Sequence, residues 1–439
     1  MQRECCDKYY LVNMASTIQE ELLHYVWKLK SFDHTDLKTV DGQKLDIIHP
    51  GYHNHDAGPD FLDAKIELDN TLWAGQVEIH IRSSDWMRHR HDADDAYQNV
   101  VLHVVYEDDA EIKRKDDTII PTLELGPLIS THLLDRYHQL YNNQLWVPCQ
   151  EQISTVADIT KAITKEQALT QRLAYRARQL RELQDELGGD MITLIYQRLA
   201  WAFGLKVNAP AMHRLVTLTP YQIIQKHLDQ PHQIEALLFG QSGLLPEHSD
   251  DTYVNILHRE YAVLKQKFSL TAMSSVEWKY AKLRPANFPT IRIAQFASFL
   301  RKHHRLDDLI LEADVREITD ALDIALGDYW KTHYKFDKES ISRVKKLGKS
   351  AKHTIIINAV VPLLFMYGMV RKSQRYKDRA LTLIESLPPE KNSIISKWET
   401  LGMSATSASD TQALIELKKQ NCDLQGCMSC PIGHKIMSS

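Results

Sequence analysis

The hydrophobic pattern of this chain changes once, near residue 128, and that change limits the folds open to it. Before it, short runs such as VEIHI alternate apolar and polar residues, and NVVLHVVYEDD is almost continuously apolar, as in half-buried and buried strands. After it, runs such as QALTQRLAYRARQLRELQDEL place apolar residues three and four positions apart, as in helices. The pattern predicts an α+β protein in which an N-terminal αβ domain with a mixed sheet is followed by a larger, mostly α-helical domain.

A chain of 439 residues is longer than a typical domain, so we expect at least two compact units. Composition shifts and loop-type clusters of Gly, Pro and Asn suggest where they divide. The predicted parts are a leader or mis-assigned start at 1–16 with Met14 as the true start, the αβ domain at 17–127, the helical domain at 128–399, and a linker with a cysteine-rich tail at 400–439.

The N-terminal domain is predicted to have the element order α, three β, α, β, β. A helix starts near Thr17, where TIQEELLHYVWKLK puts apolar residues on one face behind early glutamates. The strands are expected at KLDIIHP, DAKIELDN and AGQVEIHIRSS, followed by a short helix at DADDAYQ and strands at NVVLHVVYEDD and TIIPTLEL.

Charge and cysteine usage narrow the surroundings of the protein. A net charge of -4 gives no global basic field, so nucleic acid would need a local basic patch. Six cysteines are too few for a disulfide scaffold and suit a reducing compartment, which predicts a cytoplasmic location. The longest apolar run, 354–370, is interrupted by Asn358 and Pro362 and is shorter than the ~20 residues that span a bilayer, so we expect a buried helix and no membrane contact. Oligomeric state is left open.

Two carboxylates are expected to meet at the start of the sheet. In VEIHI, Glu78 and His80 share one face because strand side chains alternate. Asp60 follows a Gly-Pro turn at the mouth of the preceding strand, so it approaches Glu78 if the two strands pair. Two convergent carboxylates with open water positions suit Mg²⁺ or Mn²⁺. The alternative is structural: Asp60 caps a turn and Glu78 forms a salt bridge on an exposed face.

With this element order, the PD pair ending at Asp60 and the EIH string starting at Glu78 resemble the PD-(D/E)XK nuclease superfamily, also called restriction-endonuclease-like, over about 17–125. The resemblance implies that Asp60 and Glu78 hold Mg²⁺, that Glu21 or Glu20 on the first helix assists, and that phosphodiester bonds of DNA or RNA are hydrolysed. His80 stands where the superfamily has a lysine that positions or activates the attacking water.

His80 would then be a general base or a hydrogen-bond donor to phosphate. The alternative is a catalytically inactive nucleic-acid-binding or scaffold protein that retains the nuclease fold. The strings GPDFLDAKIELDNTLWAGQVEIHIRSSDW, HRHDADDAY, LHVVYEDD and RPANFPTIRIAQ also look like an uncharacterised bacterial family known only as a domain of unknown function. That second resemblance runs over the full chain and implies no established activity.

Histidines crowd the same domain, and we expect one or two of them to line the site although each alone is more often structural. They are His53, His55, His89, His91 and His103. By analogy with the superfamily, His89, His91 and Tyr97 are expected to contact phosphate. A different hypothesis takes His53, His55 and His80 with Glu78 as a transition-metal site on a β-barrel, giving an oxygenase or isomerase. The helix expected between the strands argues against a barrel.

A basic and aromatic segment in the helical domain is a second candidate for nucleic-acid contact. In WKYAKLRPANFPTIR, the basic residues Lys279, Lys282, Arg284 and Arg292 alternate with aromatic residues, a composition that holds phosphates and stacks bases. Aromatics at this spacing are more often part of a core. The GKS string at 348–350 is not a P-loop, because the first glycine of that motif would fall at Arg343.

The C-terminal tail has the spacing C-x4-C-x2-C-x3-H, formed by Cys422, Cys427, Cys430 and His434. This set suits Zn²⁺ or an iron–sulfur cluster equally. For a cluster, Cys149 could supply the fourth thiolate and staple the tail to the end of the first domain. Some PD-(D/E)XK nucleases pin a chain end with a cysteine-bound cluster, at spacings that differ from this one. The alternative is cysteines that are buried without a metal.

Overall fold

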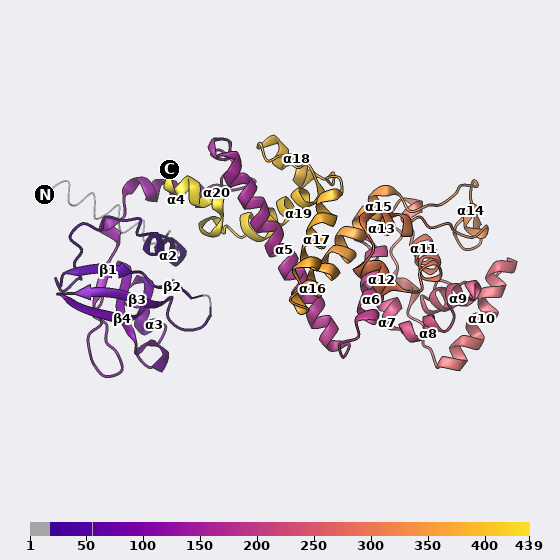
Figure 1. Cartoon of the computed structure of the whole chain (residues 1–439), viewed down its shortest axis with the longest axis horizontal. Coiled ribbons are helices and arrows are strands. Elements are labelled where there is room, and N and C mark those ends of the chain that lie inside the picture. The colour runs from indigo at the N-terminus through magenta and orange to yellow at the C-terminus, as the bar shows by residue number, and fades with distance from the viewer. Residues whose placement is uncertain (1–17, 55) are drawn as a thin grey trace. The chain divides into compact units, whose positions relative to one another are not determined.

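The strands expected between residues 44 and 125 form one mixed sheet in the computed structural model, which describes residues 18–54 and 56–439 (Figure 1). The order across the sheet is β1-β3-β4-β5-β6, with β2 also paired to β3. Pairing is antiparallel from β1 to β4 and parallel from β4 to β6. The strands are β1 (Leu45–His49), β2 (Tyr52–His53), β3 (Phe61–Leu68), β4 (Thr71–Arg82), β5 (Val100–Glu107) and β6 (Thr122–Glu124).

Two connections fix which residues of the sheet face one another. Asp69 and Asn70 join β3 to β4 with φ of 46° and 68°, the left-handed conformation that two-residue hairpin turns require. Because β4 and β5 are parallel, the chain must cross over between them, and this crossover carries α3 (Asp85–Arg88) and η1 (Asp95–Tyr97). In the resulting register Glu78 lies beside His103.

Helix α2 (Glu20–Leu29) packs against β4, which gives the N-terminal unit its second layer. Its sequence suits this position, since two glutamates occupy the first turn, where the helix dipole favours negative charge. The face toward the sheet is apolar and buried, and it consists of Leu22, Leu23, Tyr25, Val26 and Trp27. Strand β5, next to β4, is buried along almost its whole length, as expected from its continuous apolar run.

Contacts divide the chain into two units, which we call the sheet unit and the helical unit. The sheet unit runs to Thr164 and takes in Lys418–Ser439 as well, while the helical unit is Lys165–Leu417. In the sheet unit, η8 (Cys427–Ser429) and α20 (Pro431–Ser438) pack against α2 and α4 (Thr131–Tyr141). The cysteine-bearing tail therefore belongs to the same unit as the sheet. The segment 1–16, predicted as a leader or mis-assigned start, lies outside the described residues.

The helical unit confirms the prediction that the second part of the chain is mostly helical. Its core is aromatic, with Phe296 of α11 contacting Tyr196 and Phe203 of α6. The helices are α5 (Asp158–Glu186, which begins in the sheet unit), α6 (Met191–Phe203), α7 (Ala209–Thr217), α8 (Tyr221–Gln225), α9 (Pro231–Gln241), α10 (Thr252–Phe268), α11 (Pro289–Lys302), α12 (Leu306–Leu311), α13 (Val315–Ala321), α14 (Tyr329–Thr332), α15 (Lys349–Ile355), α16 (Val361–Val370), α17 (Gln374–Ser386), α18 (Ser393–Thr400) and α19 (Ala408–Glu416), with a hairpin of β7 (His333–Lys335) and β8 (Lys338–Glu339).

One helix of this unit, Lys349–Val370, has the length and apolar composition that would suffice to cross a membrane, and 67% of its apolar window is buried inside the protein. It contains the run predicted as a buried helix. Its middle is the π-helical segment η6 (Ile356–Val360), which precedes Pro362. Proline has no backbone N–H to give to a regular helix, and π segments of this kind release main-chain carbonyls for other partners. The carbonyl of Asn358, in this segment, accepts a hydrogen bond from Arg198 Nε.

Candidate metal centre

Asp60 and Glu78 meet where β3 begins. Phe61 pairs with Val77, so Asp60, one residue before the strand, lies opposite Glu78. The Asp60 N–H donates to Glu78 Oε2 at 3.1 Å, and the Ile79 N–H donates to Asp60 Oδ2 at 2.9 Å. Each carboxylate is thus oriented by the backbone of the other strand, and the pair is held together without a salt bridge between them.

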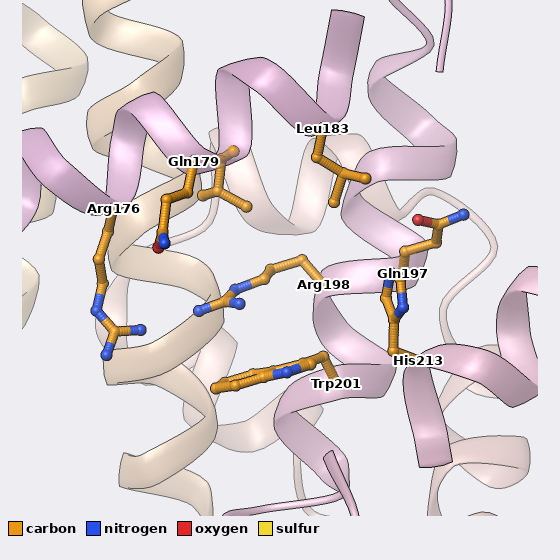
Figure 2. Close-up of a pocket in the computed structure, with 8 residues that line it drawn as sticks. Arg176, Gln179, Leu183, Gln197, Arg198, Trp201 and His213 are labelled. Carbon is orange, nitrogen blue, oxygen red and sulfur yellow. The ribbon is translucent and has the colours of Figure 1, made fainter. Parts of the chain in front are cut away.

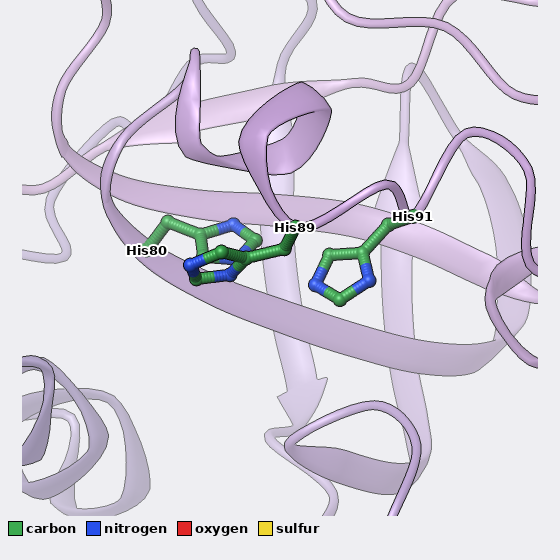
Figure 3. Close-up of side chains that lie close together, drawn as sticks. All are labelled: His80, His89 and His91. Carbon is green, nitrogen blue, oxygen red and sulfur yellow. The ribbon is translucent and has the colours of Figure 1, made fainter.

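Three imidazoles lie close together (Figure 3), and two of them contact Glu78. His80 comes from β4, while His89 and His91 follow α3 in the crossover. His80 Nε2 lies 3.1 Å from His89 Nδ1 and 3.6 Å from Glu78 Oε1, and His91 Nε2 lies 3.3 Å from the same oxygen. One ring nitrogen from each of the three histidines lies within 4.8 Å of those of the other two, which is close enough for a single metal ion.

Aromatic packing fixes these rings. The His91 ring stacks on Tyr97 with centroids 3.8 Å apart, and Trp86 presents its edge to His91 and His103. His80 Nδ1 lies 2.8 Å from His103 Nε2, and His103 is fully buried. Tyr97, which we predicted as a phosphate contact, therefore supports His91 from behind, in a cluster of buried residues with Trp86.

Helix α2 adds a second pair to the site. His24 Nε2 lies 3.2 Å from Asp60 Oδ2, and His53 packs edge-on against the His24 ring. Glu20, one turn before His24, is close enough that the charge of Asp60 contributes to raising its pKa, after the larger effect of burial. Glu21 lines, together with His24 and His53, a cavity of about 720 Å³ between α2 and the cysteine tail. Of the two glutamates proposed from the sequence, Glu20 is the one beside Asp60.

The protonation states follow from burial and neighbouring charge. Burial, with the charge of Asp60 adding to it, raises the pKa of Glu78 to about 7 although His91 opposes the shift. Burial and the charges of neighbouring imidazoles lower the pKa of His80 to about 2, and burial lowers that of His103 to about 3. Burial also disfavours the charged form of His24, but its bond to Asp60 and the nearby acids outweigh burial and raise its pKa. His80 and His103 are therefore neutral, whereas the site favours the charged form of His24 more than water does.

A neutral His80 has one N–H to place. If Nδ1 carries it, this N–H donates to His103 Nε2, and the lone pair of His80 Nε2 points at His89 Nδ1 and Glu78 Oε1. Lone pairs that face one another repel unless a proton or a metal cation lies between them. A set of imidazole and carboxylate donors suits Mn²⁺, Zn²⁺ or Fe²⁺, whereas Mg²⁺ prefers oxygen ligands. Glu78, His80, His89 and His91 could hold such an ion, with Asp60 adjacent.

Sequence reasoning missed His24 and gave His89 and His91 a different role. The signal for His24 was its spacing of four residues from Glu20, which puts both on one helix face. The transition-metal hypothesis chose different partners for His80 and Glu78. His53 lies beside His24 and stacks on Phe61, and His55 lies outside the described residues.

Four free cysteines gather at the tail of the sheet unit: Cys149, Cys422, Cys427 and Cys430. Burial raises the pKa of Cys149 and Cys427 to about 12, and the charge of Cys430 contributes in both cases. Burial also raises the pKa of Cys422, which feels the charges of the other three. The structure thus brings Cys149 to the tail thiols, while His434 packs edge-on against Tyr25 with centroids 5.5 Å apart.

The basic segment of the helical unit is only partly exposed. Lys279, Lys282 and Arg284 are exposed to solvent. Arg292 is buried, and its guanidinium donates to Gln295 Oε1 and Asn287 Oδ1 at 2.9 Å and 2.5 Å. It is therefore a structural residue rather than a member of a basic surface. Trp278 is likewise buried, with its indole N–H bonded to the carbonyl of Ser242.

These features define an α+β protein with a histidine–carboxylate centre on a mixed sheet and a helical second unit. A family model described as "Protein of unknown function (DUF2851)" matches residues 20–393, so the chain belongs to this family. The predicted resemblance to a domain-of-unknown-function family is confirmed over that range, and the resemblance to PD-(D/E)XK nucleases stays a prediction. A search of curated proteins found no match, and neither did a search of solved structures.

Proposed function

We propose that the protein is a metal-dependent, nuclease-like hydrolase of phosphodiester bonds in DNA or RNA, with its centre on the sheet unit. The observation that carries the proposal is the convergence of Asp60 and Glu78 with three imidazoles where β3 begins beside β4. The order of strands and the spacing of the two acids, the features of the nuclease resemblance, support the choice of phosphodiesters.

The donor set refines the expected metal. Glu78 with His80, His89 and His91 would bind Mn²⁺ more readily than Mg²⁺, because three of the four donors are nitrogens. A bound cation of this kind lowers the pKa of a water ligand and offsets charge on the phosphate. Asp60, fixed by the Ile79 N–H, would orient the water from the neighbouring position.

We assign to His24 the positive charge that the superfamily's lysine would bring and that His80, in the lysine's position, lacks. A neutral, buried His80 cannot give a positive charge to the phosphate. Asp60 raises the pKa of His24, which favours its charged form, and His24 is half-buried at the same site, so it would donate a hydrogen bond to a phosphate oxygen. The proposal therefore assigns metal binding to His80 and phosphate binding to His24.

The test is cleavage of single- and double-stranded DNA and RNA by the full-length protein with Mn²⁺, Mg²⁺ or Zn²⁺. Glu78→Gln and Asp60→Asn are expected to lose activity by about 100-fold or more, since each removes a charge that orders the centre. Glu67→Gln, at the opposite end of β3 from Asp60, is the matched control. Cleavage that persists in both Glu78→Gln and Asp60→Asn would refute the site. Manganese and nucleic-acid binding without turnover would favour the inactive binding or scaffold protein.

We also propose that Cys149, Cys422, Cys427 and Cys430 hold zinc or an iron–sulfur cluster. Four thiols from two distant segments, three of them buried, support this, because a metal would favour their deprotonation, which burial otherwise opposes. Metal analysis and a visible absorption spectrum of anaerobically purified protein test it, with Cys149→Ser expected to lose the metal. A colourless sample free of iron and zinc would contradict it. Four free thiols also fit the reducing cytoplasm that we propose as the location.

A further inference from the structure

Helices α5, α6 and α7 of the helical unit line a cavity of about 250 Å³ (Figure 2). Arg176 from α5 and Arg198 from α6 reach into the same space, with the Trp201 ring below Arg198. The other polar groups that line it are Gln179, Gln197 and His213. This composition is unusual for a cavity between packed helices, where cationic side chains are normally paired with acids.

Arg198 is held in a fixed orientation. Its Nε donates to the carbonyl of Asn358 at 2.8 Å, a carbonyl of the π-helical segment η6. Its guanidinium carbon lies 4.1 Å from the centroid of the Trp201 ring. These two contacts use one N–H and one face of the guanidinium, and they leave its terminal nitrogens directed into the cavity.

The two arginines lack a carboxylate of their own in the part of the chain that the structure describes. Glu416, whose charge acts on Arg176, is already paired with Arg172 at 2.7 Å. Burial and the charge of Arg172 lower the pKa of Arg176 to about 10, and burial and the charge of Arg176 lower that of Arg198 to about 9. Burial and the charge of Arg198 lower the pKa of His213, which disfavours a third positive charge in the cavity.

We propose that this cavity binds a small phosphorylated molecule, with its phosphate group between Arg176 and Arg198. Guanidinium groups match phosphate oxygens in shape and charge, and a dianion would compensate both cations at once. Gln179, Gln197 and His213 provide further hydrogen bonds around it. The site is independent of the nuclease proposal, because all its residues belong to the helical unit.

Isothermal titration of the full-length protein tests the site. The probes are inorganic phosphate, pyrophosphate, adenosine 5′-monophosphate, and one oligonucleotide with either a 5′-phosphate or a 5′-hydroxyl. We expect one saturable site, with binding weakened about 10-fold or more in Arg176→Gln and Arg198→Gln, because charged hydrogen bonds are lost. Arg178→Gln, which removes an exposed charge from the same helix, is expected to leave binding unchanged. The tightest probe identifies whether the phosphate belongs to a free ion, a nucleotide or a nucleic-acid end.

The titrations are made with EDTA and repeated in Glu78→Gln, so that the metal centre of the sheet unit does not contribute. Melting temperatures without ligand separate binding from folding. Because Arg176 has no carboxylate of its own among the described residues, Arg176→Gln is expected to fold with an unchanged or higher melting temperature, and it decides the question even if Arg198→Gln unfolds. Absence of saturable binding for every probe, or equal weakening by Arg178→Gln, would overturn the proposal.

Discussion

Each unit buries a glutamate whose pKa is raised to about 7, mainly by burial, and the surroundings of the two differ. Glu235 of the helical unit bonds to the hydroxyl of Tyr253, with His232 3.9 Å away. Glu78 of the sheet unit faces a second acid and the ring nitrogens of two histidines. A proton and one hydroxyl satisfy the first carboxyl group. The second is surrounded by groups that need a cation, so it is the neighbours, and not the burial, that indicate a site.

The largest difference between the two glutamates should appear when a metal is added. Mn²⁺ at about 1,000 times its dissociation constant is expected to raise the free energy of unfolding by about 4 kcal/mol, because it binds only the folded protein. Manganese is the better probe than zinc, since thiolates prefer the softer ion and the cysteines would compete for it. Thermal unfolding with and without EDTA measures the effect.

Glu78→Gln should abolish most of this stabilisation, whereas Glu235→Gln should retain it in full. His89→Ala, which removes an exposed ligand and disturbs the core little, provides an independent check. A manganese effect of equal size in wild type, Glu78→Gln and His89→Ala would break the comparison, because the ion would then bind elsewhere.

A third buried glutamate, Glu416, shows the opposite extreme, a carboxylate that already has its cation. It pairs with Arg172 at 2.7 Å, and both side chains are almost buried. Glu416→Gln is expected to lower the free energy of unfolding by about 3 kcal/mol, since it leaves Arg172 buried without a partner and removes the only acid near Arg176 among the described residues. Urea denaturation measures the loss. A change below about 0.5 kcal/mol would show that the pair is solvated like an ordinary surface bridge.

Glu235 should make the free energy of unfolding depend on pH. Its pKa is about 7 in the folded protein against 4.5 for the free side chain, so folding favours the protonated form. The stability that this form contributes is complete below pH 4.5 and is lost as the pH rises through 7. Glu235→Gln, which stays neutral, is therefore expected to match wild type at pH 4.5 and to exceed it by about 2 kcal/mol at pH 8. Urea denaturation at both pH values measures the difference in stability between Glu235→Gln and wild type. A difference that does not vary with pH would contradict this assignment.

The site residues that could be predicted from the sequence are those placed by local patterns, and the residues that were missed are placed by packing between distant segments. The alternation in VEIHI placed Glu78 and His80 on one face, and a two-residue turn brought Asp60 opposite, so short-range rules were enough for both acids. The positions of His24 and His91 depend on how a helix and a crossover dock on the sheet, which periodicity does not encode. Arg176 and Arg198 likewise read as ordinary solvated charges on two helices until those helices are packed together.

The smallest expected effect concerns His103, which touches the centre only through His80. It is fully buried, its Nε2 lies 2.8 Å from His80 Nδ1, and its own Nδ1 has no hydrogen-bond partner among the described residues. Partners of this kind fix the tautomer and orientation of a ligand, so His103→Leu is expected to weaken manganese binding about 10-fold, or about 1.4 kcal/mol.

His103→Gln supplies the matched control, because its amide oxygen can still accept a hydrogen bond from an N–H of His80. It should retain affinity within about threefold, while both variants keep a similar melting temperature without metal, since leucine and glutamine fill much of the imidazole's space. Equal titration curves for His103→Leu and wild type would mean that His103 only fills the core. Another group would then have to fix which ring nitrogen of His80 carries the proton. The contrast with Glu235 would rest on Glu78, His89 and His91 alone.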